Sequence, residues 1–152
     1  MTAKVWSTAD ASCGTTFAGH GCAVNAAKLS PVGRLAASCS EDGSACVWCS
    51  DSCQCLCTLA GHSDRVWSIA FSLDGASVAT GSADGHARVW DARSGRCSQE
   101  FACTDEDVCS VAFSPDGASV VTATDSSVRV WSLDERECTR FWEESFAPMA
   151  VL

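Results

Sequence analysis

The chain has 152 residues, of which 47% are hydrophobic and 19% charged, a balance that excludes an intrinsically disordered chain. Ten basic residues against nineteen acidic ones give a net charge of −9, which argues against binding to nucleic-acid phosphates or to anionic membrane surfaces. No apolar run approaches the ~20 residues of a membrane helix, and the N-terminus has no apolar signal core, so we expect an intracellular protein, cytoplasmic or nuclear.

Twelve cysteines are dense enough to suggest a small disulfide-rich secreted domain. Because no signal peptide accompanies them, we instead expect free thiols in a reducing compartment.

The chain repeats itself at a period of 42 residues, which its tryptophans reveal. Val-Trp pairs recur with steps of 42, 42 and 41 residues at Trp6, Trp48, Trp90 and Trp131. The same steps separate two further sets, Cys13, Cys55, Cys97 and Cys138, and Phe17, Leu59, Phe101 and Trp142. The shorter last step places a one-residue deletion between Phe113 and Asp125. Such a period is typical of repeat architectures.

Within each unit the local patterns predict short strands. Residues 66–71 and 108–113 are apolar-rich strands, closed by turns at 72–75 and 114–117; the matching turn of the preceding unit is at 30–33. A second strand follows, then a turn such as the Asp-Gly pair 84–85, a third strand that reaches the tryptophan, and a fourth strand. Four strands in ~40–45 residues are typical of a β-propeller blade.

Gly61-His62 lies 29 residues before Trp90-Asp91, with SLDG and SADG between the two pairs. This frame resembles the WD-repeat family, and the resemblance covers nearly the whole chain. The neighbouring units depart from it, with Gly19-His20 and Trp48-Cys49 in one, and Cys103-Thr104 and Trp131-Ser132 in the other.

The resemblance implies an all-β fold, an open β-propeller segment of four-stranded antiparallel blades. It places a partial blade at 1–18, with its third strand at 3–6 and its outer strand at 15–18. Complete blades follow at 19–60, 61–102 and 103–142, with innermost strands near 24–29, 66–71 and 108–113. Residues 143–152 are a tail or the start of a further blade, with Met149 and Leu152 at innermost-strand positions. Because closed propellers have ~4–8 blades, we expect open ends that meet further blades of a longer chain or self-associate.

The family pattern also implies a buried hydrogen-bond network in each blade, which joins a histidine, a hydroxyl, a turn aspartate and the tryptophan. By matching, its members are His20, Ser38, Asp42 and Trp48 in the first complete blade, His62, Thr80, Asp84 and Trp90 in the second, and Thr122, Asp125 and Trp131 in the third. In the third blade Thr104 stands at the histidine position.

The function implied by the family is a non-enzymatic scaffold for protein or peptide partners, without a cofactor. Its binding positions lie where the blades open onto the narrow face: Asn25, Glu41, Arg65, Trp67 and Asp107, with Ala23, Ala83, Cys109 and Thr124 at the other matched positions. Arg and Trp are frequent hot-spot residues, and Arg65 favours an acidic partner. The alternative for Trp67 is packing against a neighbour.

The cysteines of segment 49–57 suggest two other kinds of site. On a strand, the side chains of residues 53, 55 and 57 would face one side, with successive residues of this set ~6.6–6.8 Å apart. Ligands of one tetrahedral zinc ion lie much closer together, because each zinc–sulfur bond is only ~2.3 Å long. Cys55 belongs to the repeating set, which we interpret as a packing position. An alternative function is therefore a redox-sensitive protein that uses the exposed thiols among Cys49, Cys53 and Cys57.

Catalysis finds little support in the sequence. GSADG at 81–85 is not the G-x-S-x-G motif of a nucleophilic serine, and neither a P-loop nor a dinucleotide fingerprint is present. We assign no catalytic residue and no metal ligand.

Overall fold

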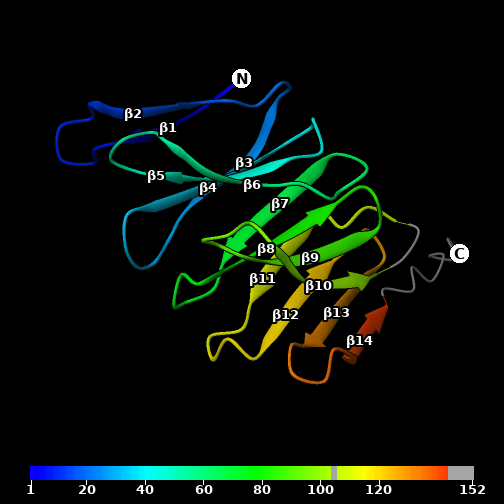
Figure 1. Ribbon diagram of the computed structural model, residues 1–152. Coiled ribbons are helices and arrows are strands. Elements are labelled where there is room, and N and C mark those ends of the chain that lie inside the picture. The colour runs from blue at the N-terminus through cyan, green and yellow to red at the C-terminus, as the bar shows by residue number, and fades with distance from the viewer. Residues whose placement is uncertain (104–105, 144–152) are drawn as a thin grey trace, which may run out of the picture.

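The computed structural model describes residues 1–103 and 106–143, and every regular element in them is a β-strand (Figure 1). Thr104 and the tail with Met149 and Leu152 lie outside the described residues. Within the described part, no helix is long and apolar enough to cross a membrane.

The strands form four antiparallel sheets, each built from strands that are consecutive in the chain. The N-terminal half-blade contains β1 (Thr2–Trp6) and β2 (Cys13–Ala18). The first blade contains β3 (Val24–Leu29), β4 (Leu35–Ser40), β5 (Ala45–Cys49) and β6 (Cys55–Leu59). The second contains β7 (Val66–Phe71), β8 (Ser77–Ser82), β9 (His86–Asp91) and β10 (Cys97–Ala102). The third contains β11 (Ser110–Phe113), β12 (Ser119–Ala123), β13 (Ser127–Ser132) and β14 (Cys138–Glu143).

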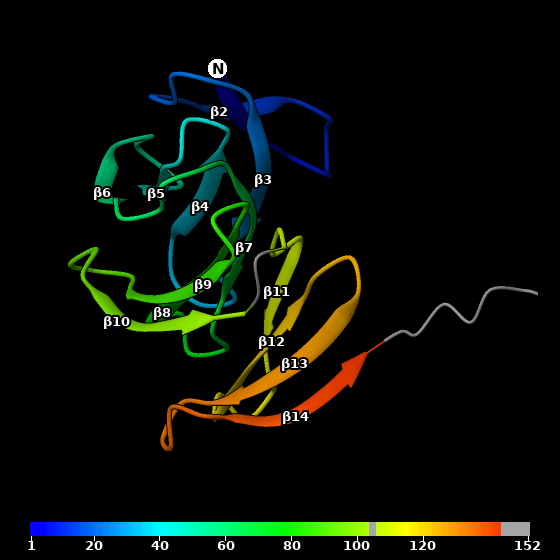
Figure 2. The ribbon, with the colours of Figure 1, turned by 90° about the vertical axis from the view of Figure 1, so that its right-hand side faces the viewer.

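The sheets follow one another as the successive layers of an open propeller segment (Figure 2). Short polar turns make each blade compact. In the β7–β8 turn, Asp74 Oδ1 accepts hydrogen bonds from the Ser72 hydroxyl at 2.6 Å and from the N–H of Ala76 at 3.0 Å. Gly75 adopts a φ of 69°, which glycine allows without steric cost. The local sequence therefore fixes the hairpin between the two inner strands.

The innermost strand of the third blade is shorter than predicted. It begins at Ser110 rather than at residue 108, because the N–H of Val108 donates to the carbonyl of Ser82 in the second blade at 2.9 Å. Val108 is fully buried at this junction. Val108 therefore contributes to the contact between two blades and not, as the strand pattern predicts, to the sheet of the third blade.

The one-residue deletion lies in the β12–β13 turn. Thr80 pairs with Arg88 in the second blade, whereas Thr122 pairs with Arg129 in the third, one residue sooner. Equivalent residues of the two blades still pair with each other across the strands, so the missing residue shortens only the turn.

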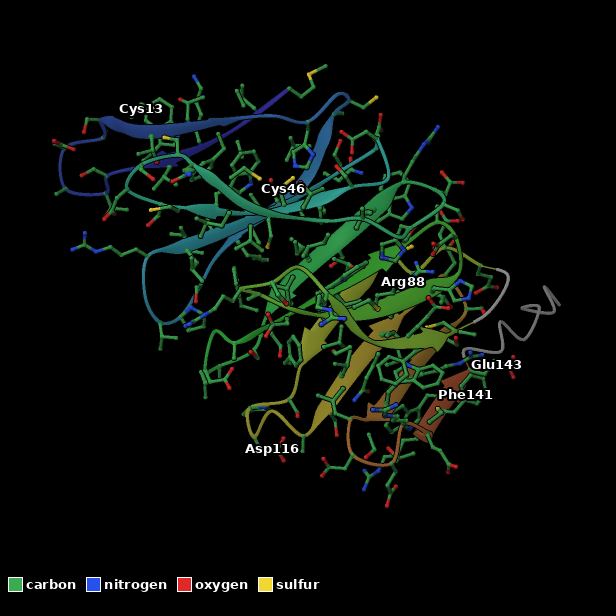
Figure 3. The ribbon with its side chains drawn as sticks, viewed as in Figure 1. Cys13, Cys46, Arg88, Asp116, Phe141 and Glu143 are labelled. Carbon is green, nitrogen blue, oxygen red and sulfur yellow. The ribbon has the colours of Figure 1, made fainter. Side chains whose placement is uncertain are left out.

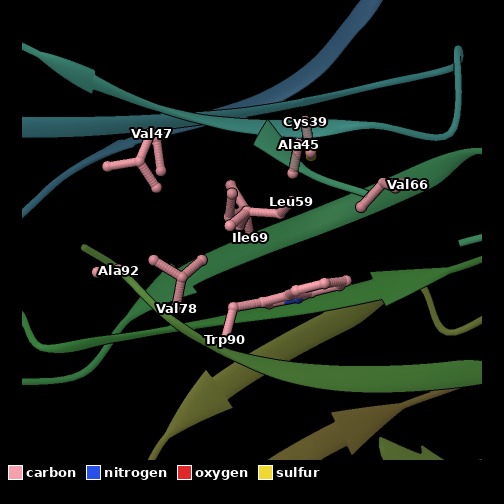
Figure 4. Close-up of a cluster of buried hydrophobic side chains, with 10 residues drawn as sticks. Cys39, Ala45, Val47, Leu59, Val66, Ile69, Val78, Trp90 and Ala92 are labelled. Atoms are coloured by element: carbon pink, nitrogen blue, oxygen red, sulfur yellow. The ribbon is translucent and has the colours of Figure 1, made fainter. Parts of the chain in front are cut away.

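The hydrophobic core lies between blades rather than within them. Val47 and Leu59 of the first blade point toward Ile69, Val78 and Trp90 of the second (Figure 4). Aromatic rings stack in the same way at the other junctions: Phe17 on Trp48 with centroids 5.4 Å apart, and Phe101 on Trp131 at 5.0 Å. Each blade therefore buries its outer-strand aromatic or leucine against the tryptophan of the next blade.

A substitution at Gly81 of β8 would test this packing between blades. A Cβ atom on Gly81 would lie 2.8 Å from both the carbonyl oxygen and Cγ1 of Val108. Gly81→Ala should therefore lower the free energy of unfolding by about 1–3 kcal/mol, as measured by chemical denaturation. Gly14→Ala is the matched control, because its Cβ would meet only Val5 O, at 3.6 Å. Equal losses in the two variants would contradict the close approach of β8 to the third blade.

Candidate functional site

The second blade contains a hydrogen-bonded chain of four side chains. The Trp90 indole N–H donates to Thr80 Oγ1 at 2.8 Å, and Thr80 Oγ1 lies 2.7 Å from His62 Nε2. His62 Nδ1 lies 2.9 Å from Asp84 Oδ2, and the two side chains are 0% and 5% exposed. The same Nδ1 lies 2.5 Å from Arg88 Nη1, so this nitrogen of the imidazole contacts both a carboxylate and a guanidinium.

Arg88 extends this chain, and sequence reasoning missed it. Its guanidinium donates to Asp84 Oδ2 at 2.8 Å and to Glu100 Oε2 at 2.7 Å. Figure 3 shows where Arg88 lies in the second blade. Burial opposes ionisation of Asp84, but hydrogen bonds from Arg88 and His62 hold the pKa of this carboxyl well below its ordinary 3.8. Burial in turn lowers the pKa of His62 below its ordinary 6.5, although the hydrogen bond to Asp84 opposes this shift. The repeat position of Arg88 holds Lys4, Cys46 and Arg129 in the other units. A basic residue at three of these four positions was a signal in the sequence that could have identified Arg88.

The first blade builds a related network with one change. His20 Nε2 lies 2.8 Å from Ser38 Oγ, which also accepts from the Trp48 indole at 2.8 Å. His20 Nδ1 contacts Ser44 Oγ at 3.2 Å and lies 3.5 Å from Asp42. Burial opposes ionisation of Asp42, yet the hydroxyl and N–H of Ser44 lower its pKa to about 2. Ser44 therefore links the imidazole to the predicted aspartate.

The third blade keeps only part of the predicted set. The Trp131 indole donates to Thr122 Oγ1 at 2.9 Å, and the Cys103 thiol lies 3.6 Å from the same oxygen. The structure does not bring Asp125 to this group, which corrects the sequence-based assignment. The turn that holds Asp125 is one residue shorter, so Thr124 rather than an aspartate receives the N–H of Ser127 at 3.1 Å.

A hollow of about 440 Å³ opens where the innermost strands begin. It is lined by Asn25, Trp67, Asp107, Cys109 and Asp125. The Trp67 indole donates to Asp107 Oδ2 at 2.8 Å, across the junction of the second and third blades. Asn25 Nδ2 donates to the carbonyl of Val66 at 2.9 Å, across the junction of the first and second blades. We call this feature the inner-strand hollow.

Several predicted binding residues meet here and others do not. Asn25, Trp67, Asp107 and Cys109 come together, and Asp125 joins them as a residue predicted for a different site. Arg65 stands outside the lining, with its guanidinium 6.0 Å from the Trp67 ring centroid. Glu41 is exposed, and its N–H donates to the carbonyl of Ala23. Ala83 and Thr124 lie in the adjacent turns, also outside the lining.

The repeating cysteines are exposed, which corrects their interpretation as packing positions. Each is paired with the tryptophan of its blade at a β-bulge, and each thiol contacts the carbonyl two residues further on: Cys13, Cys55, Cys97 and Cys138. The bulge turns these side chains outward. Across residues 1–103 and 106–143, no group of three His, Cys, Asp or Glu side chains is placed to hold a metal ion.

Two cysteines of the 49–57 segment occupy a turn that recurs in every unit. Cys53 has a φ of 58° and lies outside β6, so it is not on the strand that the sequence suggested. Cys49 stands where the next blade has Asp91, whose Oδ1 accepts from the N–H and hydroxyl of Ser94 at 2.7 and 2.6 Å. Ser52 makes the equivalent hydrogen bonds to Cys49 and, with the N–H of Asp51, lowers the pKa of this thiol below 9.0.

Comparison with known proteins assigns these repeats to a family. The family described as "WD domain, G-beta repeat" (WD40) matches residues 11–49, 53–91 and 95–132, which is well over half of the chain. The chain therefore belongs to the WD40 repeat family. Each matched segment contains the outer strand of one blade and three strands of the next. A search of the curated proteins finds no match to it.

The second-blade network predicts a pH-dependent stability. Because the pKa of His62 is lowered in the folded state, the unfolded chain binds more protons as the pH falls below 6.5. The free energy of unfolding should therefore decrease from about pH 7 to about pH 5, and His62→Ala should flatten this dependence. At neutral pH the variant should lose about 1–3 kcal/mol, because Thr80 and Asp84 lose a buried partner.

His86→Ala is the control, since its side chain is 33% exposed and lies outside the four-residue chain. Chemical denaturation at both pH values measures the effect. A His62→Ala variant that keeps the full pH dependence would contradict the assignment.

Proposed function

We propose that the chain is a non-enzymatic scaffold that binds a protein or peptide partner at the inner-strand hollow. WD40 domains generally bind protein partners and are generally non-enzymatic. The observation that carries the choice of site is the half-buried Trp67, whose indole is fixed by Asp107 across a blade junction. An aromatic side chain held in this way loses little conformational entropy when a partner packs on it.

The charges in the hollow suggest the chemistry of the partner. Asp107 and Asp125 both line it, and no basic side chain does. A cation that enters would lie near two carboxylates and the Trp67 ring, all of which attract positive charge. Arg65 favours an acidic partner, but it lies outside the lining of the inner-strand hollow. The lining itself therefore favours a basic side chain within the hollow. We therefore expect a peptide segment that contains lysine or arginine.

Binding to an array of short peptides of varied charge tests this proposal. The wild-type chain should retain peptides with a basic residue in preference to acidic ones. Asp107→Asn with Asp125→Asn should abolish this preference and keep the fold, because an asparagine oxygen still accepts from the Trp67 indole. Trp67→Ala should reduce the affinity for the selected peptides roughly thirtyfold, a loss of ~2 kcal/mol.

Asp134→Asn with Glu135→Gln is the matched control for charge. These residues follow β13, at the opposite end of the strands from the hollow. Circular dichroism shows whether each variant is folded. Retention of acidic peptides, or equal effects of the two double variants, would contradict the proposed site.

A redox-sensitive thiol function remains the second candidate, and one observation favours it. The Ser52 hydroxyl and the nearby N–H groups lower the pKa of Cys49, which increases its thiolate fraction and hence its reactivity. Burial raises the pKa of the nearby Cys57 instead.

In the native protein, a thiol reagent near neutral pH should therefore modify Cys49 before Cys57. Peptide mapping after brief labelling measures the order. Cys49→Ser should leave the slower labelling of Cys57 unchanged, and Cys57→Ser should leave the labelling of Cys49 unchanged. Labelling of Cys57 first would remove the support for this candidate.

A further inference from the structure

A second hollow lies between the second and third blades, where their innermost strands end. It measures about 370 Å³ and is bordered by the β7–β8 turn, residues 72–75, and the β11–β12 turn, residues 114–117. Figure 3 labels Asp116 on the second of these turns. The cavity shares no lining residue with the inner-strand hollow, which lies at the opposite end of the same strands. We call it the turn hollow.

A comparison of the two blade junctions shows why the turn hollow is open. Between the first and second blades, a Cβ atom on Gly75 would lie only 2.7 Å from Cγ2 of Val32. In the next pair of blades Asp74 stands at the repeat position of Val32, and nothing among the described residues lies within 4 Å of a Cβ atom on Gly117. The replacement of a valine by an aspartate therefore leaves space between the second and third blades.

One wall of the turn hollow is apolar. Phe113 and Leu133 line it and also pack on the buried cluster between the second and third blades, so their side chains are held in place. Leu73 and Pro115, each the second residue of its turn, extend this surface, and Leu73 is 61% exposed. A ligand must therefore offer an apolar body to this wall.

The polar part of the lining is negatively charged. Asp74 Oδ1 accepts from the Ser72 hydroxyl at 2.6 Å, and both residues line the hollow. Asp116 Oδ1 accepts in the same way from the Ser114 hydroxyl at 2.5 Å. These hydrogen bonds lower the pKa of both carboxyl groups, so both are ionised at neutral pH.

This distribution of charge selects a cation. Each carboxylate uses Oδ1 within its own turn, and a carboxylate has two oxygens that accept hydrogen bonds. No basic side chain is among the described residues that line the turn hollow, whereas Arg93 lines the smaller hollow of about 280 Å³ between the first and second blades. The apolar wall does not suit a hydrated metal ion, because it offers no oxygen ligands.

We propose that the turn hollow binds a small organic amine with an apolar body. Its ammonium group donates to the carboxylates of Asp74 and Asp116, and its aromatic or branched body packs on Phe113 and Leu133. The volume is at the lower end of the ~300–1,000 Å³ typical of small-molecule sites, so the ligand is compact. This site is independent of the proposed peptide site in the inner-strand hollow.

Phenethylamine and 2-phenylethanol form a matched pair of probes, because they share an apolar body and only the first carries a positive charge. Titration of the whole isotope-labelled chain, followed by NMR, measures the affinity of each probe and locates its site. We expect saturable shifts of the Gly117 and Leu133 backbone amides with phenethylamine. 2-Phenylethanol should bind about tenfold more weakly, because it lacks the charge-assisted hydrogen bonds. Equal affinities, no saturable shift, or shifts confined to the inner-strand hollow would each overturn the proposal.

Variants test the two carboxylates separately from the apolar wall. Asp74→Asn with Asp116→Asn should bring the two probes to nearly the same affinity, since the asparagine oxygens still accept the hydrogen bonds of the turns. Asp74→Val introduces the residue of the first blade and should weaken both probes, because the valine occupies the space. Asp10→Asn is the matched control: Asp10 Oδ1 also accepts from a serine hydroxyl of its turn, at 2.8 Å, but Asp10 does not line the hollow. A loss with Asp10→Asn equal to that of the double variant would contradict the assignment.

Discussion

The hydrogen bond from a tryptophan indole to a hydroxyl on the neighbouring strand organises every complete blade. It joins the third strand to the second at 2.8–2.9 Å and places the ring at the junction with the preceding blade. There the ring packs against Phe17, Leu59 or Phe101. One side chain therefore sets both the register within a sheet and the contact between sheets. The blades stack in order because each depends on its predecessor to bury this ring.

The polar groups around that hydrogen bond vary more than the bond itself. Arg88 neutralises Asp84 in the second blade, Ser44 mediates the contact in the first, and Cys103 approaches the hydroxyl in the third. Each arrangement still gives the buried hydroxyl a second partner, which avoids the cost of an unsatisfied polar group. The network thus tolerates changes in its outer members as long as the hydroxyl and the indole persist.

Aromatic side chains are accessible at the inner-strand hollow and on the two sheets at the ends of the segment. The inner-strand hollow forms where Trp67 and Asp107, from adjacent blades, meet at the start of the innermost strands. Strand β1 and the exposed face of β14, which includes Phe141, lie at the two ends of the segment (Figure 3). The inner-strand hollow and the turn hollow each combine an aromatic ring with two carboxylates.

The sequence by itself determined the repeat period and the four strands of each unit, and its resemblance to a known family identified the indole–hydroxyl pairs. The period and the strands depend on alternation, turn residues and spacing, which are local properties of the chain. Only the tertiary structure showed that Arg88 belongs to the network, that Asp125 lines the inner-strand hollow instead, and that Cys97 is exposed. A shortened turn, a β-bulge and the approach of another blade control these positions. The partners concerned can stand 40 residues apart, as Trp67 and Asp107 do, so the geometry of the neighbouring blade selects them rather than the local pattern.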